Sequence, residues 1–186
     1  GGVINDTITS SGTINVSGGT ISNTISNTGE INATTENGIA AFRNTITNTS
    51  GKVYLKADGT LNDNAKINGG NLYIGATATS ANTIIAKADN IAADTTEIYA
   101  TNTLKLTEGT LGGLISGDGT LKIAENVEAA AQYIQAGTNT IDSGKQLILT
   151  GKAAADAMGT LSKNITGSGT TIIKAGNTIT AEAMIN

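Results

Sequence analysis

Short stretches in which apolar and polar residues alternate recur along the whole chain. They include residues 3–9, 52–56, 71–74, 104–106 and 121–123. Successive side chains of a β-strand point to opposite faces of a sheet. The alternation therefore predicts many strands of about three to five residues, each with one face buried.

The predicted strands follow a common unit, which is a turn residue, then a small polar residue, then Ile, Leu or Val. Gly12-Thr13-Ile14 and Gly119-Thr120-Leu121 are two copies, and neighbouring copies are commonly about seven to eleven residues apart. Because the apolar residue follows the turn at a constant offset, we expect it to point into a core. The predicted core positions are Ile14, Ile21, Leu61, Leu72, Leu111, Leu121 and Ile172.

Two all-β architectures accept many short, evenly spaced strands: a parallel β-solenoid, and an antiparallel β-sandwich or barrel. Asn-Gly hairpin signals are rare, and the strands are short for a sandwich. With aromatic residues at 3%, a sandwich core would be hard to fill. We therefore predict one domain, residues 1–186, folded as a right-handed parallel β-solenoid of about eight coils. The alternative is a sandwich joined to its neighbour by a donated strand.

Two alanine-rich stretches interrupt the rhythm, at residues 124–136 and 152–158. We interpret both as short excursions from the rod or as strands in a tight corner. The absence of proline fits a solenoid, because nearly every strand residue there donates to a ladder of hydrogen bonds. Asn and Thr side chains at matching places in successive coils are expected to stack in the same way.

The composition excludes several classes of function. The chain has no Cys and no His, which removes disulfides, zinc fingers and every nucleophile–His–acid triad. Its net charge of −4 argues against nucleic-acid binding. No apolar run is long enough for a membrane-spanning helix.

The Gly-Thr-Ile and Gly-Thr-Leu units and the richness in Asn, Thr and Ser, together with the lack of Cys and Pro, resemble a known class of proteins. It comprises the β-helical passenger regions of bacterial autotransporters and the filamentous-haemagglutinin-like adhesins, and the stretch 116–123 (SGDGTLKI) is typical of them. The resemblance covers essentially the whole chain. It implies export and display outside the cell or on the bacterial surface.

Candidate chemistry is sparse. The close carboxylate pairs Asp58/Asp63, Asp89/Asp94 and Glu125/Glu128 are interpreted as solvated charges rather than as acid–base pairs. We expect no catalytic residue, no metal and no cofactor. Tyr54, Tyr73, Tyr99 and Tyr133 are candidates for an aromatic surface strip that stacks on sugars, although packing at the rim is the favoured interpretation. Tyr54 and Tyr73 are 19 residues apart, close to one coil, so we expect these two to lie one above the other.

The two chain ends carry few charges. Only Asp6 lies near the first alternating segment and only Glu182 follows the last one. Since the open ends of a solenoid present unpaired strand edges, we expect end-to-end association into filaments. The expected function is that of a non-enzymatic stalk, adhesin or fibre subunit. The alternatives are an adhesin segment that binds a surface glycan or host receptor, and a β-helix enzyme that processes polysaccharides.

Overall fold

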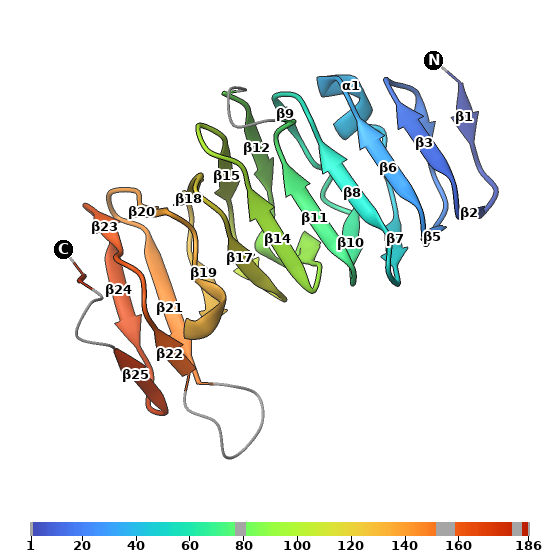
Figure 1. Cartoon of the computed structure of the whole chain (residues 1–186). Coiled ribbons are helices and arrows are strands. Elements are labelled where there is room, and N and C mark those ends of the chain that lie inside the picture. The colour runs from blue at the N-terminus through green and yellow to red at the C-terminus, as the bar shows by residue number, and fades with distance from the viewer. Residues whose placement is uncertain (1, 77–80, 152–158, 180–183, 186) are drawn as a thin grey trace.

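The strands of the computed structural model wind into a parallel β-solenoid of about eight turns (Figure 1). The structure describes residues 2–76, 81–151, 159–179 and 184–185. Every pairing between strands in these ranges is parallel, so the antiparallel sandwich is excluded. The right-handed winding stays a prediction from the general preference of parallel crossovers.

The first face of the rod consists of two sheets that follow one another along its axis. The backbone N–H of Gly112 donates to Ile91 O at 3.0 Å and joins them. Its strands, in order along the rod, are β2 (Ile8–Ser10), β5 (Ile25–Asn27), β7 (Thr45–Asn48), β10 (Lys66–Asn68) and β13 (Ile91–Ala92), then β16 (Gly109–Thr110), β19 (Val127–Ala130), β21 (Gln146–Thr150) and β24 (Thr170–Ile173).

The second face begins with a six-stranded parallel sheet. An isolated bridge between Ile115 and Ile134 extends it toward the C-terminal coils. Its strands are β3 (Thr13–Val16), β6 (Glu30–Ala33), β8 (Lys52–Leu55), β11 (Asn71–Ile74), β14 (Thr95–Ile98) and β17 (Leu114–Ser116), followed by β22 (Gly159–Leu161) and β25 (Asn177–Ile179).

The third face begins with a two-stranded sheet and continues beyond the single α-helix. A parallel bridge between Ile21 and Phe42 leads from the sheet toward that helix. The strands are β1 (Val3–Ile4) and β4 (Thr20–Ile21), then β9 (Gly59–Thr60), β12 (Thr83–Ala86), β15 (Thr103–Leu106), β18 (Thr120–Ile123), β20 (Thr138–Ile141) and β23 (Thr166–Gly167).

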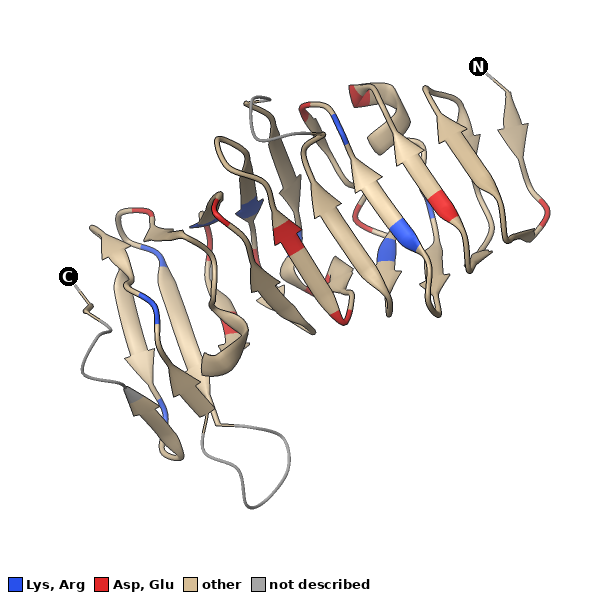
Figure 2. Ribbon diagram, in the orientation of Figure 1, with Lys and Arg blue, Asp and Glu red and all other residues tan. Residues whose placement is uncertain are grey.

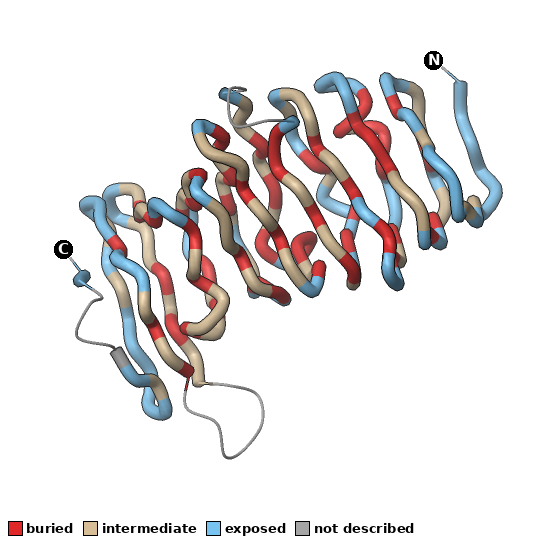
Figure 3. The backbone as a smooth tube through the Cα atoms, in the orientation of Figure 1, coloured by how far each residue is buried: buried red, intermediate tan, exposed pale blue. Residues whose placement is uncertain are grey.

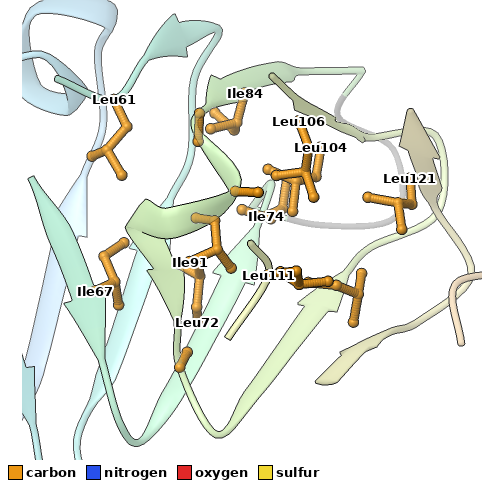
Figure 4. Packing of buried hydrophobic residues seen from close by; sticks show 14 of the residues in the cluster. Leu61, Ile67, Leu72, Ile74, Ile84, Ile91, Leu104, Leu106, Leu111 and Leu121 are labelled. Atoms are coloured by element: carbon orange, nitrogen blue, oxygen red, sulfur yellow. The ribbon is translucent and has the colours of Figure 1, made fainter. Parts of the chain in front are cut away.

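The core is a narrow column of buried, mostly aliphatic side chains that runs along the bore. Figure 3 shows that buried residues recur from coil to coil along the rod. Among the predicted core positions, Leu61, Leu72, Leu111 and Leu121 are at most 2% exposed and lie within this column (Figure 4). Ile21 is 5% exposed. Ile14 is only half-buried, because it lies in the first described turn and has a coil on one side only.

The prediction that Ile172 points into the bore is wrong. Ile172 is 38% exposed and pairs in register with Ile148, which also faces outward, whereas its neighbour Thr171 pairs with the buried Leu147. The sequence Gly169-Thr170-Thr171-Ile172 has one residue more than the usual unit between glycine and the apolar position. Since the side-chain period of a strand is two, this extra residue turns Ile172 to the outer face.

Only the first of the two alanine-rich stretches lies within the described residues. Residues 124–136 stay within the rod: β19 pairs with both β16 and β21, and the 3-10 helix η2 (Ala131–Tyr133) forms the next corner. This stretch is therefore an alanine-rich strand and corner, not an excursion. Residues 152–158 lie outside the described residues. A second 3-10 helix, η1 (Ala88–Asn90), forms another corner.

The α-helix α1 (Glu36–Ile39) was not anticipated from the sequence. Its N-cap is Thr35, whose side-chain oxygen accepts a hydrogen bond from the backbone N–H of Gly38 at 3.0 Å. Ile39 is fully buried and Gly38 packs against the backbone of Val16, so α1 closes the corner between β6 and β7. Within the described residues, no helix is long and apolar enough to cross a membrane.

A buried asparagine pair closes the corner between the first and second faces. Asn27 and Asn48 occupy paired positions of β5 and β7, and Asn27 Nδ2 donates to Asn48 Oδ1 at 2.8 Å. Asn48 Nδ2 then donates to the backbone oxygen of Gly51, also at 2.8 Å. The pair thus links two neighbouring coils, and Asn48 also satisfies the carbonyl of the buried turn residue Gly51.

Candidate functional site

Three of the four tyrosines lie on the outer side of the second face. In β8 and β11 the burial alternates, so that Val53, Leu55, Leu72 and Ile74 point inward while Tyr54 and Tyr73 point outward. The two strands pair in parallel with Tyr54 opposite Tyr73. Tyr99 directly follows β14, the next strand of the same face. We call these three residues the tyrosine column.

The rings of the tyrosine column are stacked. The ring centroids of Tyr54 and Tyr73 are 4.6 Å apart with an interplanar angle of 14°. Those of Tyr73 and Tyr99 are 6.0 Å apart at 16°. Tyr73 comes from the middle strand, so its two neighbours approach it from opposite sides. The column is a direct product of the parallel register, which places successive coils about 4.8 Å apart.

Polar groups surround the first ring. Lys56 Nζ lies 4.6 Å from the ring centroid of Tyr54, within range of a cation–π interaction. Asn32 pairs in register with Tyr54, and its Nδ2 donates to Glu30 Oε1 at 2.7 Å. Glu97 pairs in register with Tyr73 at the other end of the column.

The pKa values of Tyr54 and Tyr99 are both raised. For Tyr54 burial is the main cause, followed by the charges of Tyr73 and Glu30. For Tyr99 burial is again the main cause, followed by Glu97 and Tyr73. Each effect disfavours the phenolate, so both hydroxyls stay protonated at neutral pH.

The predicted strip of Tyr54 and Tyr73 is brought together by the fold, and Tyr99 extends it. A sugar stacks on an aromatic ring through the open face of that ring, yet here the ring faces are turned toward one another. Tyr73 has a ring on each side, and all three tyrosines are half-buried. This geometry favours an inter-coil stack over a sugar-binding platform.

The carboxylates considered as acid–base pairs are held by neighbouring coils. Asp58, Asp89 and Asp94 each accept a hydrogen bond from a backbone N–H more than twenty residues away. Their donors are Thr83, Thr110 and Gly70, at 2.6, 2.9 and 2.9 Å respectively.

The remaining carboxylates of these pairs lie in inter-coil ion pairs. Lys87 Nζ lies 3.5 Å from Asp63 and 3.1 Å from Glu108. Both partners raise the pKa of Lys87, and the hydrogen bond to Glu108 is the largest cause. Glu125 pairs with Lys145, and Glu128 pairs with Lys174 at 3.2 Å. Figure 2 shows how thinly the charged residues are spread along the rod.

Within the described part of the chain, no three His, Cys, Asp or Glu side chains gather into a group that could hold a metal ion. Comparison of the chain with protein-family models, with curated proteins and with solved structures finds no match.

Proposed function

We propose that the protein is a non-enzymatic structural solenoid, displayed outside the cell, that serves as a stalk, adhesin or fibre subunit and stacks end to end with further copies of itself. The observation that carries this proposal is the distribution of exposed apolar side chains. Among the described residues, the exposed large hydrophobic residues all lie in the coils at the two ends of the rod. They are Val3, Ile4, Ile172, Ile173, Met184 and Ile185.

The N-terminal end face is apolar and hollow. Val3 and Ile4 are 61% and 46% exposed, although Ile4 pairs in register with the buried Ile21. A hollow of about 230 Å³ at this end is lined by Ile4 and Ile21 together with Ile8, Ile14 and neighbouring residues. These side chains occupy the positions that are fully buried in later coils, so a coil placed on this face would cover them.

At both ends of the rod, some strands have a described partner on one side only. Among the described residues, β1, β2 and β3 at the N-terminal end and β23 and β24 at the C-terminal end each pair with one strand. Ile173 continues the inward column of Leu149 but is 41% exposed, because no described coil covers it. Edges of this kind pair with other strands unless they are blocked. The N-terminal end face of one copy would pack on the C-terminal end face of the next. Such a head-to-tail contact does not close into a ring and so builds an open filament.

The sides of the rod support a structural role. Most strands there have a parallel partner on each side, and the outer surface is mostly uncharged. The alternatives remain a segment that binds a surface glycan or host receptor and an enzyme that processes polysaccharides. The closed ring stack of the tyrosine column and the engaged carboxylates favour the structural role over both.

The experiment is sedimentation velocity of the 186-residue chain from submicromolar to high micromolar concentration. We expect species heavier than the 18.6 kDa monomer to accumulate as the concentration rises. Substitution Ile4→Lys or Ile173→Lys places a charge on one end face, and each should raise the dissociation constant by about tenfold or more. The control is Thr60→Lys, which adds the same charge at an exposed position in the middle of the rod.

A lone monomer at every concentration would refute association between copies, and the two end faces would then need coils from a longer chain to cover them. Equal weakening by Thr60→Lys and by the end-face variants would show that net charge, not the end faces, controls association.

A further inference from the structure

The tyrosine column holds two phenol rings at a fixed short distance. Tyrosine is rare in this chain, with four residues in 186, and yet three successive coils of one face each contribute one ring. The closest pair is Tyr54 and Tyr73, with ring centroids 4.6 Å apart. Both side chains are half-buried on the outer side of the sheet, so part of each remains open to solvent.

We propose that Tyr54 and Tyr73 form a site of oxidative cross-linking, in which a one-electron oxidant such as a haem peroxidase with hydrogen peroxide joins them as dityrosine. Each phenol gives one electron to the oxidant and one proton to water, leaving a phenoxyl radical. The two radicals couple through a new C–C bond between ring carbons ortho to the oxygens. Each of these carbons then passes its hydrogen, by way of solvent, to the phenol oxygen of its own ring. The pair loses two electrons and two protons in total, and one hydrogen peroxide accepts them to form two waters.

The fold supplies the proximity that this reaction lacks in solution. Free tyrosyl radicals must diffuse together, whereas the parallel register holds these two rings one above the other in adjacent coils. Holding two reactants in place converts a bimolecular step into an effectively unimolecular one. The product would be a covalent bond between the coil containing β8 and the coil containing β11, in addition to the hydrogen bonds that already join them.

The other two tyrosines set the expected order of reaction. Tyr99 is also stacked on Tyr73, but the longer distance of 6.0 Å makes this pair the slower one to couple. Tyr133 lies in η2 and packs against the hydrophobic core, away from the column. It therefore provides an internal control for reaction at a tyrosine that stacks on no other ring among the described residues.

The test is peroxidase treatment of the purified chain at submicromolar concentration, read out by dityrosine fluorescence and by tryptic peptide mapping. Cleavage at lysine places the four tyrosines in four different peptides, which are residues 53–56, 67–87, 88–105 and 123–145. We expect the main product to join peptide 53–56 to peptide 67–87, with a mass two hydrogens below the sum of the two peptide masses. Before digestion, the cross-linked chain should run as a monomer on a denaturing gel.

Two variants make the assay selective. Tyr73→Phe keeps the ring and its stacking but removes the phenol common to both pairs, so the fluorescence yield should fall by about tenfold or more. Tyr133→Phe should leave the yield unchanged. Oxidation should also raise the thermal midpoint of the wild-type chain and leave that of the Tyr73→Phe variant where it was. Undiminished dityrosine in Tyr73→Phe would overturn the proposal, as would products that join separate chains through Tyr133.

Discussion

Replacing Thr96 by valine should stabilise the protein. Thr96 occupies an inward position of β14, between Leu72 and Ile115 in the adjacent strands, and is fully buried. Its hydroxyl oxygen has no hydrogen-bond partner among the described groups, because its neighbours in the paired strands are aliphatic. Valine has nearly the same shape, so Thr96→Val replaces an unsatisfied polar group by a methyl group without opening a cavity.

The magnitude follows from the cost of burying an unpaired hydroxyl. That cost is about 1–3 kcal/mol in proteins, and Thr96→Val should recover it as free energy of unfolding. For a chain of this size each kcal/mol raises the thermal midpoint by roughly 2–4 °C. The assay is thermal and urea denaturation followed by circular dichroism, with the denaturant slope compared between the variant and the wild type.

The matched control is Thr103→Val, which makes the same chemical change at a half-exposed, outward position of β15. There the hydroxyl reaches water, so the free energy of unfolding should change by less than about 0.5 kcal/mol. A loss of stability in Thr96→Val, or an equal gain in both variants, would refute the reasoning. Either result would mean that the buried hydroxyl is satisfied or that β-propensity alone explains the effect.

Three further predictions test the core, the ladder and the tyrosine column. Leu121→Ala should cost about 2–5 kcal/mol of unfolding free energy in urea titrations, whereas Ile172→Ala should be nearly neutral, because only Leu121 fills the bore. Similar losses in both variants would contradict the assigned strand register. Leu104→Pro should abolish soluble expression or the cooperative melt, because β15 pairs with strands on both sides; a normally melting variant would argue against a central parallel ladder. The pKa values of Tyr54 and Tyr99 are raised in the fold, so the folded protein is fully stable with respect to these two groups below the unfolded pKa near 10 and loses stability as the pH rises above it. The double variant with Phe at both positions should therefore keep more of its neutral-pH stability in alkaline melts. An unchanged alkaline profile would show that these two phenols do not control the loss of stability.

The fold could be predicted from the sequence because local and global requirements agree. The alternation, the repeated turn units and the scarcity of aromatic residues all favour short strands around a narrow bore. Ile172 shows where this reasoning fails, since one inserted threonine changes the face and the sequence offers no reference coil to reveal it. The helix α1 escaped prediction for a related reason. Its capping signal, Thr35 followed by Gly38, is short and lies in a corner of variable length.

The site could be predicted in part. Tyr54 and Tyr73 are one coil apart, and the register confirms that they lie opposite one another. The spacing places only Tyr54 and Tyr73 one above the other, because Tyr99 comes 26 residues after Tyr73 and lies two positions beyond Glu97, the residue that pairs with Tyr73. Spacing alone could not identify it, since the distance between paired residues varies from coil to coil. Along the second face that distance is 17, 22, 19, 24, 19 and 19 residues for successive pairs that start at Ile14 and Ile31.

The parallel ladder also determines how the rod responds to force. The hydrogen bonds between coils run along the rod axis, so a pull on the two ends loads one layer of bonds at a time instead of shearing many together. Coils should therefore peel off singly from an end. A released coil of 17–26 residues adds at most about 60–95 Å of extended chain. Under tension such a rod lengthens in discrete steps and absorbs work at each one, while the coils that are still stacked keep their shape.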